Sequence, residues 1–335
     1  MILGLVGSEM CIRDRPHSTT PTSLGPPNRL RHELIVSCGT VRLRTTTNYS
    51  AETGDKRKPD LRGVPDPQLS FEDCVRDRRA ISRWSQKSRV RMMYRLATID
   101  WTAVDGVMEM VTLTYPREFP TDGRVAKAHL QAFRKRCIRR WGEDYTLGTW
   151  KMEFQRRGAP HFHLYVNRPP VAWVEWLGWA RRAWFEIVGS GDRRHLDQGV
   201  RIDRQFCSKA RSSKAIAWYF SKHGLKAGAG KAYQNDVPEG YERCGRFWGV
   251  WGLTSTETEI EIDTRDFIEL RRLLVRFRRA ATGRKNIKAP GRLIGTWAMS
   301  HDGFGFTAQA LRSIGVEVDA QQLVDLRVGE LVLQT

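Results

Sequence analysis

One carboxylate and two imidazoles stand close together near the middle of the chain, in a spacing that suits metal chemistry. Apolar and polar residues alternate over Trp150–Phe154 and again over His161–Val166, after a turn that contains glycine and proline. This period of two predicts a β-hairpin with one buried side. If the apolar residues share the core, Glu153, His161 and His163 share the opposite, solvent-facing side. Imidazole and carboxylate groups on one open face predict a divalent-metal site.

Each part of this pattern also has a plainer explanation. A His-x-His pair on a strand is often no more than two exposed polar residues. Glu153 could instead form a surface ion pair with Arg156 or Arg157 in the turn of the hairpin. The same two arginines could contact phosphates directly, so the hairpin alone leaves its chemistry open.

A second set of reactive side chains lies further along the chain, between positions 217 and 226. On a helix, Tyr219, Lys222, His223 and Lys226 share one face. Ammonium groups beside a tyrosine favour its phenolate form and attract a phosphate, which suits nucleophilic attack. The alternative is an amphipathic helix with a half-exposed tyrosine. Either of two flanks could be buried, formed by Ile216 with Phe220 or by Trp218 with Leu225.

The surrounding sequence predicts the elements that must position both sets. Periodicity indicates helices at 85–97, 124–141, 171–188 and 211–226, a hairpin at 147–167, and strands at 108–114, 200–203 and 246–251. Helices set against a mostly antiparallel sheet predict an α+β domain, residues 71–262, with a central antiparallel β-sheet flanked by helices. A basic helix at 264–281 then belongs to a partly helical C-terminal extension, residues 263–335.

Residues 1–66 are predicted to be a disordered or artefactual leader. Most of this stretch is rich in Ser, Thr, Pro and Arg and has little periodicity. Its segment Gly7–Arg15 resembles a translated sequencing adapter. The apolar residues before that segment lack the basic region and the cleavage site of a signal peptide.

The balance of charge points to a polyanionic partner. The 335 residues include 56 Lys and Arg against 37 Asp and Glu, for a formal net charge of +19. Such a surplus favours nucleic acid, because each neutralised phosphate releases condensed counterions. No apolar run reaches the length of a membrane span, and no basic helix presents a lipid-seeking face. The six cysteines include no CxxC pair, which argues against a zinc ribbon or a disulfide scaffold and fits a reducing cytoplasm.

Two further features each have two explanations. The arginine-rich helix at 264–281 could bind a DNA backbone, or it could simply present a solvated charged face. Four tryptophans could stack on bases, but their near-helical spacing is more typical of a core face. These residues are Trp173, Trp176, Trp179 and Trp184.

Together, the two reactive sets resemble the motifs of the HUH endonuclease superfamily, and specifically of rolling-circle replication initiators of small phages and plasmids. The resemblance covers about residues 80–255. It consists of four blocks in order, Val111–Pro116, Glu153–His163, Tyr219–Lys222 and Gly245–Gly249. The second block is the most specific of the four.

This resemblance implies a defined chemistry. His161 and His163, with Glu153, would hold Mg²⁺ or Mn²⁺ against the scissile phosphate of single-stranded DNA at a replication origin. Tyr219 would attack that phosphate and leave a 5′-phosphotyrosine bond with a free 3′-OH that primes replication. Lys222 would orient or neutralise the phosphate. The further DNA contacts that we expect come from Arg156, Arg157 and Lys226.

The resemblance also sets expectations about partners. Some phage initiators carry a second tyrosine four residues away on the helix, but Ala215 and His223 stand there, so Tyr219 is reused or a second subunit supplies its partner. Because no helicase domain is apparent, a host helicase and polymerase would complete replication in the cytoplasm of a bacterial cell, away from any membrane.

Two other functions stay open. A single-tyrosine transposase or a plasmid mobilisation relaxase would share the metal and tyrosine geometry. A non-catalytic, basic nucleic-acid-binding protein would need neither, and its histidine pair would be incidental.

Overall fold

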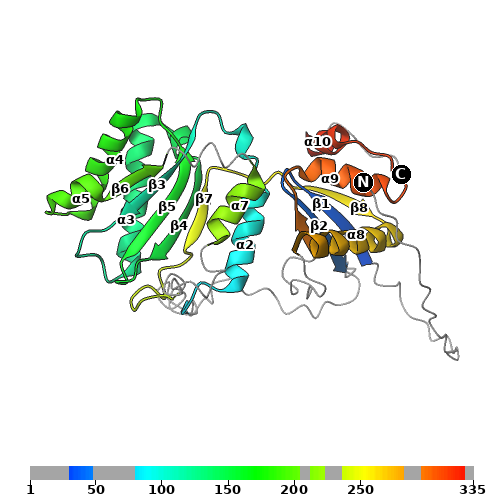
Figure 1. Cartoon of the computed structure of the whole chain (residues 1–335), viewed down its shortest axis with the longest axis horizontal. Helices are drawn as coiled ribbons and strands as arrows, with labels where there is room; N and C mark the ends of the chain where they lie inside the picture. Colours follow the sequence, from blue (N-terminus) through cyan, green and yellow to red (C-terminus); the bar gives the residue numbers. More distant parts are fainter. Residues whose placement is uncertain (1–29, 48–79, 204–211, 223–235, 283–295, 329–335) are drawn as a thin grey trace, which may run out of the picture.

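The computed structural model describes residues 30–47, 80–203, 212–222, 236–282 and 296–328. These residues form two lobes, and each lobe is an antiparallel β-sheet covered by helices (Figure 1). The predicted α+β class with a central antiparallel sheet is confirmed. No described helix combines the length and the apolar character that crossing a membrane requires.

The first lobe contains all four sequence blocks and a five-stranded sheet. Its strands are β3 (Met108–Thr114), β4 (Gly148–Phe154), β5 (Pro160–Asn167), β6 (Val200–Asp203) and β7 (Trp248–Trp251). Its α-helices are α2 (Gln86–Ala97), α3 (Gly123–Trp141), α4 (Trp173–Val188), α5 (Arg193–Gln198) and α7 (Ser213–Lys222). Two short 3₁₀ helices complete it, η1 (Trp101–Ala103) and η2 (Glu143–Thr146).

The two faces of the five-stranded sheet, in the order β6-β3-β5-β4-β7, have different partners. Side chains alternate along each strand, so Val111 and Phe162 enter the core beneath α3 and α4. Met110 and Tyr165 point the other way, into a core shared with α2 and α7. Figure 1 shows the two helix pairs on opposite sides of the sheet. Trp176 and Trp184 are fully buried in the first core, which confirms the core-face explanation for those two residues.

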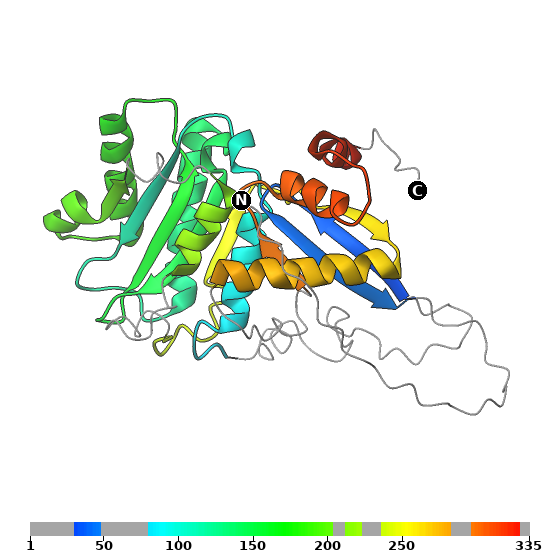
Figure 2. The ribbon, with the colours of Figure 1, turned by 45° about the vertical axis from the view of Figure 1, so that its right-hand side comes forward.

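The second lobe joins segments from before and after the first. Its four-stranded sheet runs β8-β1-β2-β9, from β1 (Leu30–Val36), β2 (Thr40–Thr47), β8 (Thr258–Ile262) and β9 (Thr296–Met299). Its helices are α8 (Thr264–Thr282), α9 (Gly303–Arg312) and α10 (Ala320–Val328). Leu34 and Val41 of the sheet pack against Leu270 of α8 and Leu311 of α9 (Figure 2).

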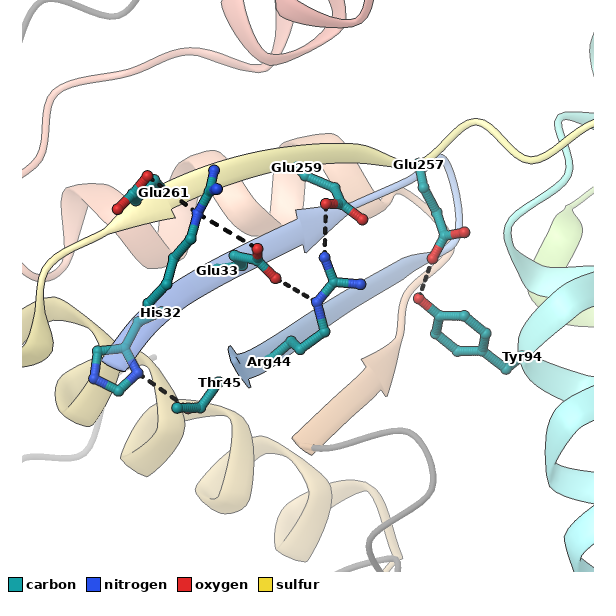
Figure 3. Close-up of polar contacts among 9 residues, drawn as sticks. His32, Glu33, Arg44, Thr45, Tyr94, Glu257, Glu259 and Glu261 are labelled. Carbon is teal, nitrogen blue, oxygen red and sulfur yellow. Dashed lines mark hydrogen bonds and ion pairs between the residues drawn. The ribbon is translucent and has the colours of Figure 1, made fainter. Parts of the chain in front are cut away.

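The opposite face of the second sheet is charged. Arg44 of β2 lies between Glu33 of β1 and Glu259 of β8, with its Nη2 2.7 Å from Glu259 Oε2 (Figure 3). The network continues through Arg31 to Glu261 at 3.1 Å. Opposite charges on neighbouring strands stabilise the pairing of those strands, and here they link β2, β1 and β8 across the face that the helices leave uncovered.

The prediction of a leader is wrong for residues 30–47, which form β1 and β2. Leu34 and Val36 are fully buried there, and β1 pairs with β8 as well as with β2. The apolar partners of these strands come from helices near the other end of the chain, so no local periodicity announced them. The rest of residues 1–66 lies outside the described residues. The C-terminal segment also contributes strand β9 to this sheet in addition to the expected helices.

The two lobes meet along α2 and the start of α7. Thr256, which precedes β8, donates to Thr98 O after α2 at 2.8 Å, and Tyr94 of α2 donates to Glu257 (Figure 3). The Tyr94 ring also meets the indole of Trp297 edge-on, with 5.3 Å between ring centroids. In the turn between β1 and β2, Cys38 Sγ lies 3.4 Å from Ser213 Oγ in the first turn of α7.

Membership of β1 in the fold gives a stability prediction. Leu34→Ala should lower the free energy of unfolding by about 3 kcal/mol, because the deleted methyls leave a cavity in the second core. Leu30, in the same strand, is 57% exposed, and Leu30→Ala should change stability by less than about 0.5 kcal/mol. Urea denaturation followed by circular dichroism measures both. Equal stability of the two variants would show that β1 is not part of the folded lobe.

Candidate active site

The predicted hairpin is present, and its register gathers the expected side chains. Glu153 of β4 lies directly opposite His161 of β5, and Lys151 lies opposite His163. Directly opposed residues in antiparallel strands share a face, so these four side chains point the same way. The strands are joined through a tight turn in which Gly158 N donates to Gln155 O at 2.8 Å. Gly158 has a φ of +82°, a conformation that glycine adopts without strain.

Two threonines of β3 hold the imidazoles. Thr112 Oγ1 lies 3.3 Å from His163 Nδ1, and Thr114 Oγ1 lies 3.2 Å from His161 Nδ1. The two histidine rings meet edge to face, with 4.4 Å between their centroids. When each Nδ1 donates to its threonine, each Nε2 keeps its lone pair. That arrangement is the usual support for metal-ligating histidines.

The donor atoms fit a divalent cation in chemistry, and two of them also fit in spacing. His163 Nε2 and Glu153 Oε2 are 3.5 Å apart, and adjacent ligands bonded to one cation at about 2.1 Å lie about 3 Å apart. Among the residues that the structure describes, no three His, Cys, Asp or Glu side chains are gathered closely enough to hold one ion. His161 therefore stands beside the His163–Glu153 pair without completing a three-ligand group.

The sequence pattern gave no role to Lys151, which lies at the centre of the site. Its side chain is 2% exposed, and its Nζ lies 2.5 Å from Glu153 Oε1 and donates to Phe220 O of α7 at 3.0 Å. The same ammonium stands 3.8 Å from the centre of the Trp84 ring, a favourable cation–π distance. Lys151 thus links the carboxylate of β4 to the backbone of α7.

The expectation that this face is open to solvent is wrong for its β4 residues. Glu153 and Lys151 are both buried, because α7 and Trp84 cover this part of the sheet. The alternative pairing of Glu153 with Arg156 or Arg157 is also wrong, since Glu153 pairs with Lys151. The signal for Lys151 was its place two residues before Glu153, on the same strand face.

Electrostatics keep Glu153 ionised. Burial alone would raise its pKa, but the hydrogen bond from His163 and the charge of Lys151 outweigh burial and hold the pKa well below its usual range. Burial lowers the pKa of Lys151. The pair is a buried carboxylate and ammonium that each depend on the other for compensation.

Tyr219 lies midway along α7, on the helix that covers this face. Of the two possible flanks, Ile216 and Phe220 are buried, whereas Trp218 is 52% exposed. Tyr219 itself is partly buried and packs against the core beneath α7. Its pKa is raised by burial and by the negative charges of Asp203 and Glu153. The expected phenolate is therefore not favoured by the side chains that the structure describes.

The remaining predicted residues have mixed outcomes. Lys222 ends α7, but its side chain, together with His223 and Lys226, lies outside the described residues. Arg157 donates to the carbonyls of Tyr115 at 2.7 Å and of Pro116 at 2.6 Å, so it anchors the hairpin turn to the segment after β3. Arg156 is exposed in the same turn, and its contact with DNA stays a prediction.

Comparison with known proteins gives two matches. Residues 108–224, which include the hairpin and Tyr219, match the model of a family of replication-associated proteins of the ORF2 type. The chain is also similar to a replication-associated protein of Pseudomonas phage Pf3, with 29% identity over 208 residues that cover 60% of this chain and 70% of that protein. No solved structure gives a significant match.

The buried ion pair yields a stability prediction. Lys151→Met should lower the free energy of unfolding by about 3 kcal/mol, because it leaves the Glu153 carboxylate buried without its main partner. The double variant Lys151→Met/Glu153→Leu should recover most of that loss, since neither charge remains. Lys135 is exposed on α3, so Lys135→Met is a matched control. Urea denaturation tests the set, and a single variant as stable as the control would contradict the assigned pairing.

Proposed function

We propose that this chain is a replication initiation protein that nicks single-stranded origin DNA through metal-assisted attack by Tyr219. The observation that carries the proposal is the position of α7, which is tied by Lys151 to the sheet face that bears Glu153 and His163. The likeness to phage replication-associated proteins supports a role in the initiation of DNA replication.

In this proposal the protein's own groups orient the nucleophile and the phosphate. The Tyr219 oxygen forms a bond to phosphorus and loses its proton, while the 3′ oxygen leaves with the bonding electrons and becomes a 3′-OH. A 5′-phosphotyrosine bond retains the energy needed for later rejoining. Lys222 neutralises the phosphate. A bound Mg²⁺ or Mn²⁺, held by His163 and Glu153 with His161, would polarise the phosphoryl oxygen and offset negative charge.

The electrostatics of the site favour this division of work. Asp203 and Glu153 raise the pKa of Tyr219 along with burial, so the nucleophile rests as a phenol in the protein alone. A cation beside Glu153 and a lysine beside the phosphate would each act against that shift. Attack would then require both partners of the reaction, which protects the tyrosine from futile chemistry.

We assign the DNA partner as the single strand at a replication origin, with a host helicase and polymerase acting on the primed product in the bacterial cytoplasm. A single-tyrosine transposase or mobilisation relaxase is the alternative within the same chemistry. Nicking at an origin followed by primer extension favours the initiator, whereas insertion or strand transfer favours the alternative. Binding without nicking, unaffected by EDTA, would favour a non-catalytic DNA-binding protein.

The first test is covalent capture. With Mn²⁺ and a single-stranded oligonucleotide that contains the origin, the wild-type chain should give a shifted protein–DNA band on a denaturing gel. Tyr219→Phe should abolish that band and keep DNA affinity within about twofold, because only one hydroxyl is removed. Tyr145, which lies away from this sheet face in η2, provides the control Tyr145→Phe. An adduct that persists in Tyr219→Phe would overturn the assignment of the nucleophile.

The second test concerns the support of the metal ligand. Thr112→Val removes the group that faces His163 Nδ1 and should weaken Mn²⁺ binding by about 10–100-fold, the usual effect of losing an outer-shell partner. Calorimetry without DNA measures this directly. Thr149→Val is the matched control, since Thr149 is a buried threonine of β4 that donates to Gly249 O. Equal Mn²⁺ affinity in the two variants would sink the proposed ligand role of His163.

A further inference from the structure

Helix α3 is charged with one sign only. It carries arginines and lysines and no aspartate or glutamate, and its buried stripe, including Leu130 and Phe133, packs on the sheet. The basic side chains are therefore concentrated toward the outer side of the helix. Favourable interaction of Arg139 and Arg140 with the helix dipole explains a preference for the last turn. It does not explain the groove that the next helix completes.

A groove of about 570 Å³ runs between α3 and α4. Arginines line it from both helices, namely Arg136, Arg139 and Arg140 from α3 and Arg182 from α4. Glu186 is the one acidic residue in this lining, and it is bound by Arg136, whose Nη1 lies 2.6 Å from Glu186 Oε2. Arg139, Arg140 and Arg182 are exposed around the remaining space. Such a set of forked cations complements a chain of phosphates.

The groove also has an aromatic wall. Trp179 is partly buried and lines it, with its ring 4.4 Å from that of Trp141 and 5.8 Å from that of Trp176. These neighbours hold the indole in one orientation, so little side-chain entropy is lost when a planar group stacks on it. Arginines beside a fixed aromatic surface are the combination that binds single-stranded nucleic acid without sequence preference.

The groove and the candidate active site lie on opposite sides of the sheet. Helices α3 and α4 cover one face, and α2 and α7 cover the face that bears Glu153, His163 and Tyr219 (Figure 1). A strand bound between α3 and α4 is therefore a different stretch of DNA from the one presented to Tyr219.

We propose that the α3–α4 groove binds the backbone of single-stranded DNA that flanks the segment in the active site. The identity of this DNA rests on the proposed function, whereas the polyanion preference rests on the arginines alone. A second contact on the same strand raises the effective concentration of the origin at the active site without adding sequence preference. It also gives the large positive charge of the chain a defined place of action.

The test separates binding from cleavage. All variants carry Tyr219→Phe and are assayed without metal, by fluorescence anisotropy on a long oligothymidine. The groove variant is Arg139→Gln/Arg140→Gln/Arg182→Gln. Its matched control is Arg271→Gln/Arg276→Gln/Arg279→Gln, which removes three arginines from α8 in the other lobe. Circular dichroism confirms that each variant is folded.

The groove variant should bind at least about 10-fold more weakly than the control, and its plot of log affinity against log salt should flatten by about 2, the share of three phosphate contacts on a single strand. Equal losses in both triple variants would show a general charge effect and overturn the proposal. A duplex of the same length that competes as well as the single strand would overturn the choice of ligand. If the otherwise wild-type chain forms no tyrosine adduct but the groove variant still loses affinity, the proposed function fails and the groove stands.

Discussion

A buried ammonium organises this protein. Lys151 cannot be left unpaired in the interior, because an isolated buried charge costs far more free energy than one domain has to spare. Glu153 Oε1 and the carbonyl of Phe220 satisfy it, one from the same strand and one from a distant helix. The consequence is a fixed position of α7 over the sheet, and with it a fixed position of Tyr219 relative to His163.

The second lobe holds the same helix at its other end. The first turn of α7 is anchored where Ser213 donates to Ile99 O and meets Cys38, in the turn between β1 and β2. At that turn Gly39 approaches the backbone so closely that a Cβ would collide with Ala97 O. The strands near the start of the chain therefore do more than extend the fold. They fix the start of α7, while Lys151 fixes its far end through Phe220.

Charge is distributed by distance from the site. Inside, Glu153 and Asp203 set a negative environment that raises the pKa of Tyr219 together with burial. Outside, the arginines of α3 and α4 give the opposite face its positive character. Under the proposed function, this arrangement attracts a polyanion over a wide surface and reserves the unfavourable electrostatics for the one place where a cation and a phosphate enter together.

The sequence by itself determined the local elements and their alignment. Alternation over β4 and β5 predicted the hairpin and the shared face of Glu153, His161 and His163, because a period of two follows from strand geometry. It did not reveal that α7 buries Lys151 and Glu153, which flank of α7 is buried, or that residues 30–47 form strands. Tertiary structure decided these because each depends on partners far away in the chain: β1 pairs with β8, and Lys151 with Phe220. Local periodicity carries no record of such partners.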